Sequence, residues 1–176
     1  MSMTDVRWHE IQPPSSGVAP VPGLPGVRLD TAPVFHDARG SLHELYRLDE
    51  IPPEFKPVMA CASWSLPGVS RGPHQHVQQD DYFTFAGPSD FLVVLWDARP
   101  GAAGPRQGWR VKTGQSRPLH ISVPDGVIHG YRNTGSVPGL VITVTSALFR
   151  GPGRKESIDE IRHELDPNSP YRFPES

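Results

Sequence analysis

Short apolar segments separated by glycine and proline constrain the fold of this chain most strongly. The 176 residues include 21 prolines and 17 glycines, about twice the usual share, and they stand between apolar stretches rather than in a low-complexity tract. Because both residue types interrupt regular structure and favour turns, the pattern is typical of an all-β sandwich or barrel. The predicted strands are 34–35, 42–47, 58–66, 82–85, 91–97, 109–111, 119–123, 127–131 and 140–145.

Three regions are expected along the chain. Proline and glycine are densest at 13–27, which predicts an extended N-terminal arm over 1–30, lying on the domain or across a partner. The β-barrel is expected over 31–155. A short helix and a tail are expected over 156–176.

The expected C-terminal helix depends on two local signals. Ser157 and Glu160 have the spacing of a capping box, in which each side chain satisfies a free backbone N–H group. Ile158, Ile161 and Leu165 then fall on one helical face.

Charge and hydropathy exclude some classes of partner. The net charge is −2 and the lysines and arginines are scattered, so we expect no nucleic acid partner. The longest apolar run, 91–96, is far too short to span a membrane, and the N-terminus has no targeting pattern. We therefore expect a cytoplasmic protein without membrane association. The single cysteine, Cys61, lies in an apolar stretch and is expected to pack as a small hydrophobic residue.

Two histidines one residue apart open the first candidate site, in the stretch RGPHQHVQQDD. On an extended segment His74 and His76 point to the same side. Asp80 has the same parity and Asp81 the opposite one, so a tight turn after Val77 could bring one carboxylate to the histidines. Asp80 is the predicted ligand.

A second cluster, VPDGVIHGYRN, occupies 123–133. Pro124 and Gly126 predict a turn, and Val127, His129 and Tyr131 then alternate onto one side of a strand. We expect His129 to join His74, His76 and Asp80 at the mouth of the barrel. Three imidazoles and a carboxylate suit Fe, Mn, Ni, Co, Cu or Zn, and a metal-free pocket fits the same residues. One divalent transition metal ion is the cofactor considered, and no organic cofactor is expected.

Both clusters resemble the motifs of the cupin superfamily. The first motif matches at Gly68, His74, His76, Asp80 and Gly87, with Asp in place of Glu, and the second at Pro124, Gly126, His129 and Asn133. A closer resemblance covers most of the chain. FHDARGSLHELYR at 35–47, GVSRGPHQH at 68–76, LWDAR at 95–99 and ISVPDGVIHGY at 121–131 look like a divergent branch of the dTDP-4-dehydrorhamnose 3,5-epimerase family.

This resemblance implies a fold, a partner and several residue roles. The family's enzymes are dimeric jelly-roll cupins of carbohydrate biosynthesis that need no metal and act on a nucleotide-linked 4-keto sugar. His74 matches the catalytic base, and Arg39 and Arg71 match arginines that hold the substrate and its diphosphate. The lysine that supports the enolate in the family has no counterpart, because this chain has no lysine between Lys56 and Lys112.

The departures leave three functions open. The family's tyrosine acid is replaced by Ile142 and Thr143, so a metal at the four-residue cluster could polarise the carbonyl instead, and Tyr82 or Tyr131 could move the proton. The catalytic candidates are His74, His129, Tyr82 and Tyr131. The three hypotheses are a sugar-nucleotide epimerase with a rebuilt site, a metal-dependent cupin enzyme acting on another small molecule, and a non-catalytic sugar-binding cupin.

Overall fold

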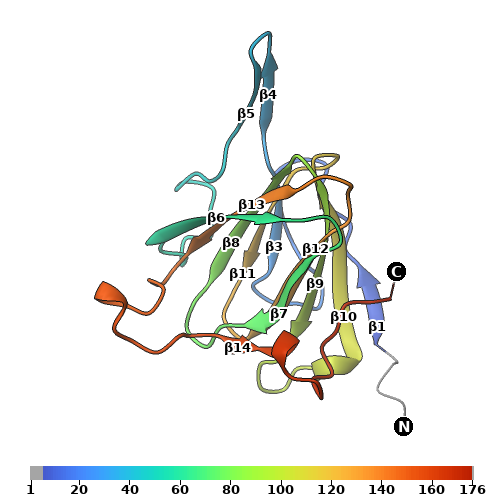
Figure 1. The fold of residues 1–176 in the computed structure, drawn as a ribbon, viewed down its shortest axis with the longest axis vertical. Coiled ribbons are helices and arrows are strands. Elements are labelled where there is room, and N and C mark those ends of the chain that lie inside the picture. Colours follow the sequence, from blue (N-terminus) through green and yellow to red (C-terminus); the bar gives the residue numbers. More distant parts are fainter. Residues whose placement is uncertain (1–5, 176) are drawn as a thin grey trace.

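Two six-stranded sheets pack face to face in the computed structural model, which describes residues 6–175 (Figure 1). The first sheet has the order β1 (Arg7–Glu10), β10 (Gln107–Gly114), β9 (Asp90–Asp97), β12 (Val127–Asn133), β7 (Ser70–Gln75), β14 (Ile161–Arg162). The second has the order β2 (Val18–Pro20), β3 (Arg28–Thr31), β11 (Leu119–Val123), β8 (Asp81–Gly87), β13 (Gly139–Thr145), β6 (Met59–Ser65). This arrangement confirms the all-β jelly-roll expected from the sequence.

A separate hairpin and three short 3-10 helices complete the described chain. The hairpin, β4 (Val34–Asp37) and β5 (Gly40–His43), projects away from the sheets in Figure 1. The 3-10 helices are η1 (Gly104–Arg106), η2 (Pro152–Arg154) and η3 (His163–Leu165). Within residues 6–175 no helix is long and apolar enough to cross a membrane.

All nine strands expected from periodicity overlap strands of the structure. The segment expected at 42–47 ends early, since β5 stops at His43. Strand β7 was not among the nine predicted strands. It is extended, which is the condition for His74 and His76 to point to the same side. The strands β1, β2 and β3 lie in the segment expected to form the N-terminal arm, where they add to the outer edges of both sheets.

Alternation places one face of each strand in the interior. Phe83 and Phe85 of β8 and Val127 and Tyr131 of β12 belong to the main buried cluster between the sheets. Burial of such aromatic and aliphatic side chains supplies the dominant stabilising term, about 25 cal/mol per Å² of apolar surface. The same alternation sends Asp81 and His129 inward with these hydrophobic neighbours.

The outer face of the first sheet is also covered. Val94, Trp96 and Ile128 point away from the interior and form a second buried cluster. Trp8 packs edge-on against Trp96 from the N-terminal side, and Tyr171 does so from the C-terminal side. The two ends of the described chain therefore brace the sheet that carries His74, His76 and His129.

The predicted C-terminal helix is wrong. Residues 161–162 form strand β14, which pairs with β7 through Ile161 with Gln75 and Arg162 with His74, and only the three-residue helix η3 follows. A helix this short is marginal in water, whereas the free edge of β7 offers backbone groups that the segment satisfies. Tertiary pairing overrides the local capping signal.

Candidate functional site

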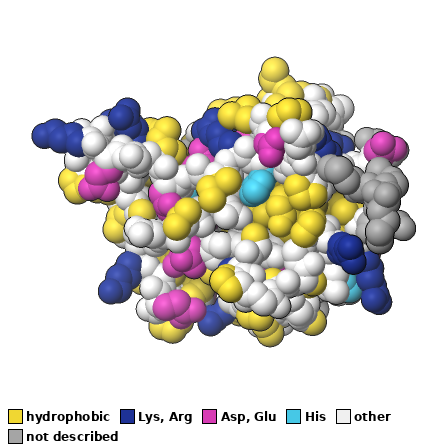
Figure 2. All heavy atoms as spheres, turned by 90° about the horizontal axis from the view of Figure 1, so that it is seen from below, with side chains coloured by type: hydrophobic (Ala, Val, Ile, Leu, Met, Phe, Trp, Pro, Cys, Tyr) yellow, Lys and Arg dark blue, Asp and Glu magenta, His cyan; other side chains and the backbone are white. Residues whose placement is uncertain are grey.

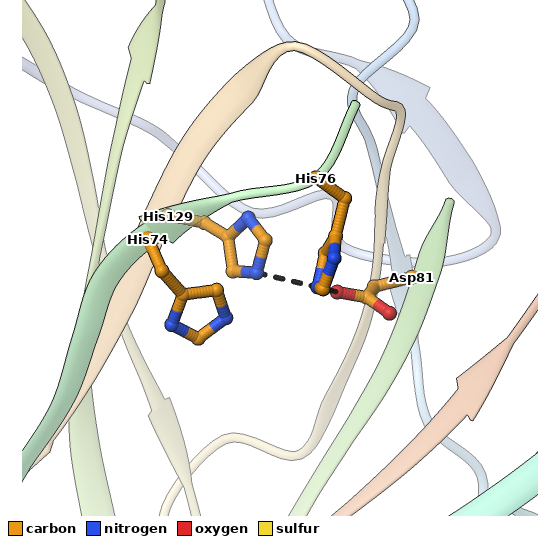
Figure 3. A group of neighbouring side chains, drawn as sticks. All are labelled: His74, His76, Asp81 and His129. Atoms are coloured by element: carbon orange, nitrogen blue, oxygen red, sulfur yellow. Dashed lines mark ion pairs between the residues drawn. The ribbon is translucent and has the colours of Figure 1, made fainter. Parts of the chain in front are cut away.

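Three histidines and an aspartate converge between the two sheets of the jelly-roll (Figure 3). His74 and His76 come from β7, His129 from β12 and Asp81 from β8, and one ligand atom of each lies within 4.8 Å of all the others. β7 and β12 are neighbours, with His74 opposite His129 in the register. The predicted convergence of the three histidines is present in the structure.

The carboxylate of the cluster belongs to Asp81, and the choice of Asp80 is corrected. Asp81 is buried and shares the inward parity of Phe83, whereas Asp80 precedes β8 and accepts a hydrogen bond from the backbone N–H of Asp125 at 2.9 Å. The chain leaves the extended conformation after β7 and turns before β8. Counting alternate residues from His76 therefore fails across the turn. Counting back along β8 from the inward-facing Phe83 gives Asp81 as the inward carboxylate.

Hydrogen bonds fix the orientation of two histidine rings. His129 Nδ1 donates to the carbonyl of Val127 at 3.1 Å, and His76 Nδ1 donates to the carbonyl of Asp159. A carbonyl can only accept, so each ring carries its hydrogen on Nδ1 and presents Nε2 to the cluster. Both Nε2 atoms lie 3.3 Å from Asp81 Oδ2.

The remaining contacts complete the electrostatics of the cluster. Gln79 Nε2 donates to Asp81 Oδ1 at 2.9 Å and lies 3.2 Å from His76 Nε2. Burial alone would raise the pKa of the Asp81 carboxyl, but its interactions with His129 and His76 outweigh burial and lower that pKa. Burial likewise opposes protonation of His76, yet Asp81 raises the pKa of His76 overall.

His74 differs from the other two histidines. Burial, together with repulsion by His129 and His76, lowers the pKa of His74 to about 2. Its Nδ1 lies 3.7 Å from Glu160 Oε1, which is an ion-pair distance rather than a hydrogen bond, and Arg162 Nε donates to the other Glu160 oxygen at 2.6 Å. His74 is therefore a neutral imidazole at physiological pH, with a carboxylate behind it.

The cluster lies in the wall of a cavity of about 700 Å³, the size of a small-molecule pocket. Arg71 lines this cavity, its guanidinium donating to Ser65 Oγ at 3.2 Å and to the carbonyl of Trp64 at 2.9 Å. Tyr131 also lines it, and burial raises the pKa of its phenol, which bonds Ser63 Oγ at 2.8 Å. Both residues line the cavity, and their roles in binding and proton transfer stay predictions.

Two other predicted residues lie elsewhere. Tyr82 points to the opposite side of β8 from Asp81 and packs against Phe55 and His120, so its role in proton transfer is not supported. Because adjacent residues of a strand point to opposite sides and Asp81 points inward, Tyr82 points to the outer side of β8. Arg39 lies on the β4–β5 hairpin, bound to Asp37 with 90% of its side chain exposed, and it does not line the cavity.

Three site residues escaped sequence analysis or were misread. The segment from Glu156 to Glu164 forms one wall of the cavity, and it brings Asp159 and Glu160 to the histidines. No local signal identifies these residues, because only the pairing of β14 with β7 places them. Cys61 was expected to pack as a buried hydrophobic residue, and it is instead exposed on the cavity wall.

Known structures share this fold. A dTDP sugar isomerase from Desulfovibrio desulfuricans G20 superposes with a TM-score of 0.68 at 23% identity, covering 82% of this chain and 87% of that one. No protein-family model matches the chain.

Two curated proteins are related in sequence. The spore coat polysaccharide biosynthesis protein SpsL of Bacillus subtilis strain 168 is 34% identical over 128 residues, which is 72% of this chain and 82% of that protein. The probable low-salt glycan biosynthesis epimerase Agl13 of Haloferax volcanii is 30% identical over 133 residues, 73% of this chain and 83% of that protein. The chain belongs to the dTDP-4-dehydrorhamnose 3,5-epimerase-like family.

Proposed function

We propose that this protein is a sugar-nucleotide epimerase or isomerase that removes a proton next to the carbonyl of a nucleotide-linked 4-keto sugar. One observation carries the proposal: His74, Tyr131 and Arg71 line a single cavity of about 700 Å³. The names of the relatives support the same class of chemistry, since Agl13 is a probable glycan biosynthesis epimerase and the superposed structure is a dTDP sugar isomerase.

The chemistry follows from the state of each group. Neutral His74 accepts the proton from the carbon beside the ketone, and the C–H electron pair moves onto the carbonyl oxygen as an enolate. Addition of a proton from water to the other face of that carbon, while His74 releases its proton to water, gives the epimer and a neutral histidine. Transfer of the His74 proton to a neighbouring atom of the substrate gives the isomer and likewise a neutral histidine. A positioned base contributes about 10² to 10⁴ in rate when its pKa lies near the working pH, so proton abstraction requires the Glu160 carboxylate, 3.7 Å from His74 Nδ1, to raise the basicity of His74 in the substrate complex. The phenol of Tyr131 can donate to the enolate oxygen.

Arg71 suits the other end of the substrate. Its guanidinium is fixed by Ser65 and Trp64 on the cavity wall. A planar, permanently charged fork binds phosphate oxygens in pairs, so Arg71 would hold the diphosphate of a nucleotide sugar.

Deuterium exchange tests this function directly. Purified protein incubated in heavy water with a dTDP-4-keto-6-deoxy sugar should place deuterium on a carbon adjacent to the carbonyl, as detected by NMR. His74→Gln should abolish the exchange while retaining the fold by circular dichroism. Absence of exchange for every keto sugar tried, with the nucleotide sugar still binding, would instead favour the non-catalytic sugar-binding alternative.

We also propose that the protein is a homodimer assembled through the β4–β5 hairpin. Phe35 and Leu42 are 55% and 61% exposed on this projecting element, and exposed apolar residues gathered on one element favour association. Arg39 on the same hairpin does not reach the cavity of its own chain, so any contact with substrate would be made in the second copy. Leu42→Ser should shift the mass measured by light scattering from dimer to monomer. A cytoplasmic location remains a prediction.

The cluster of three histidines and Asp81 favours a second candidate function, a metal-dependent cupin enzyme acting on another small molecule. This alternative requires an ion in stoichiometric amount and no exchange at a sugar carbon. Elemental analysis of protein purified without a histidine tag, together with the exchange experiment, separates the two candidates.

A further inference from the structure

We propose that His76, Asp81 and His129 hold one divalent transition metal ion, with His74 left beside it as an unliganded base. The site itself is argued from contacts within the chain. The role of the ion, polarisation of the substrate carbonyl as a Lewis acid, rests on the function proposed above.

The first argument is the direction of the lone pairs. His76 and His129 both carry their hydrogen on Nδ1, so two Nε2 lone pairs point toward the same carboxylate oxygen at 3.3 Å. His129 Nε2 is fully buried and has no hydrogen-bond partner within residues 6–175. Three electron-rich atoms this close repel one another unless a proton or a metal cation lies between them, and a metal cation would satisfy both Nε2 lone pairs at once.

The second argument is the spacing. Two ligand atoms each about 2.0 to 2.1 Å from an ion, at the tetrahedral angle, are about 3.3 to 3.4 Å apart. Both Nε2 atoms stand at this separation from Asp81 Oδ2. A pair of imidazoles and one carboxylate, with open positions on one side, is a ligand set used by divalent transition metals in catalytic sites.

The third argument is the shell of residues around the three ligands. Ligating histidines almost always donate their second ring nitrogen to a carbonyl or carboxylate, and here Val127 and Asp159 accept from His129 and His76. Gln79 holds Asp81 Oδ1 and so aims Oδ2 at the two rings. The contact of Gln79 with His76 Nε2 would be given up when the ion binds.

His74 belongs to the four-residue cluster but also faces a carboxylate outside it. In Figure 3, His76 and His129 lie beside Asp81, whereas His74 stands away from the carboxylate. Its Nδ1 faces Glu160 instead. With three protein ligands an ion would keep open positions toward the cavity, and His74 would remain free to take a proton from a substrate bound there.

Metal titration tests the assignment independently of catalysis. Untagged protein is stripped with a chelator and titrated with Co²⁺, following visible absorption, while elemental analysis gives the stoichiometry. Wild type should bind one ion per chain. Asp81→Asn should weaken Co²⁺ binding by about 100-fold or more, because the ligand loses its charge, whereas the matched control Asp80→Asn should stay within about threefold.

A second pair of variants tests the role of His74 and the outer shell. His74→Gln should bind Co²⁺ within about threefold of wild type yet lose deuterium exchange, while His76→Gln should lose both, and circular dichroism confirms the fold of each. Glu160→Gln lies outside the ligand set and should leave Co²⁺ affinity nearly unchanged, within about threefold.

Several results would overturn the proposal. Wild type that binds less than stoichiometric Co²⁺, equal losses for Asp80→Asn and Asp81→Asn, or a loss of affinity for His74→Gln as large as for Asp81→Asn would each do so. Stoichiometric Co²⁺ without exchange on any keto sugar supports the site and removes the proposed function. Exchange that persists in chelator-treated protein keeps the function and removes the ion's role.

Discussion

His129 Nε2 and Asp81 Oδ2 lie 3.3 Å apart although they come from different sheets, since β12 belongs to the first and β8 to the second. Their meeting point is the barrel interior, beside Phe83, whose ring centroid is 5.3 Å from that of His129. The candidate site is thus formed by side chains of both sheets. A substitution that shifts either β12 or β8 should alter the geometry of the site.

Tyr131 and Tyr82 form a matched pair for testing acid catalysis. Tyr131→Phe should lower kcat by about 10² to 10⁴ if the phenol donates to the enolate, with a loss of about 1 kcal/mol of stability from the bond to Ser63. Tyr82→Phe should leave kcat unchanged, because Tyr82 faces Phe55 and His120 away from the cavity. Steady-state kinetics and urea unfolding check both variants, and similar kcat values for the two would refute the assignment.

Arg71 is expected to act in binding. Removing a charge-assisted hydrogen bond costs about 1.5 to 3 kcal/mol, so Arg71→Ala should raise KM roughly 10- to 100-fold with a smaller change in kcat. Arg132→Ala is the control, because Arg132 lies over the ring of Phe173, 4.7 Å from its centroid, and does not line the cavity. An unchanged KM for Arg71→Ala would place the phosphate groups elsewhere.

Gly72 and Gly68 have nearly the same backbone conformation and different surroundings. Their φ angles are +78° and +75°, so alanine at either position costs roughly 1 to 2 kcal/mol of backbone strain. At Gly72 an added Cβ would also lie 2.6 Å from the carbonyl oxygen of His129, while at Gly68 it would meet nothing within 4 Å. Gly72→Ala should therefore cost about 1 to 3 kcal/mol more in urea unfolding and should weaken Co²⁺ binding. Equal losses of unfolding free energy for the two variants would show that β12 moves away from the added Cβ at little energetic cost.

His120 should make stability depend on pH. Burial lowers its pKa to about 4, and Thr84, which donates to the carbonyl of Leu45, accepts from His120 Nδ1 at 3.0 Å. The unfolded chain binds the proton near pH 6.5 and the native state does not, so this contribution is present above pH 6.5 and is lost as the pH falls toward 4.

The corresponding experiment compares wild type with His120→Phe. Between pH 7 and pH 4.5 the free energy of unfolding of wild type should fall by about 2 to 3 kcal/mol more than that of the variant. Other titrating groups are common to both proteins and cancel in the difference. Parallel pH profiles would show that His120 is protonated without cost in the native state.

The basic side chains on one face of the molecule are dispersed. In Figure 2 the Lys and Arg side chains on the face seen from below stand apart, with hydrophobic and acidic side chains between them. Recognition of a phosphate group by Arg71 in the cavity wall stays a prediction, which the Arg71→Ala variant tests.

Periodicity was enough to predict nine of the strands and the meeting of the histidines. Alternation in 127–131 and the one-residue spacing of His74 and His76 are local properties, and a strand converts them directly into a common side. The same reasoning failed for Asp80, because the turn after His76 breaks the count of parity. It failed again for the C-terminal helix, where pairing with the edge of β7 decides the structure.

Asp159 and Glu160 follow every strand of the two sheets except β14 in sequence, yet Asp159 accepts a hydrogen bond from His76 and Glu160 faces His74. During synthesis on the ribosome, the pocket can therefore form only after the last part of the chain has been added. A prematurely terminated product ending before residue 159 would lack the groups behind His76 and His74 and also β14 and Tyr171, so the reaction centre and the cover of the first sheet would be lost together.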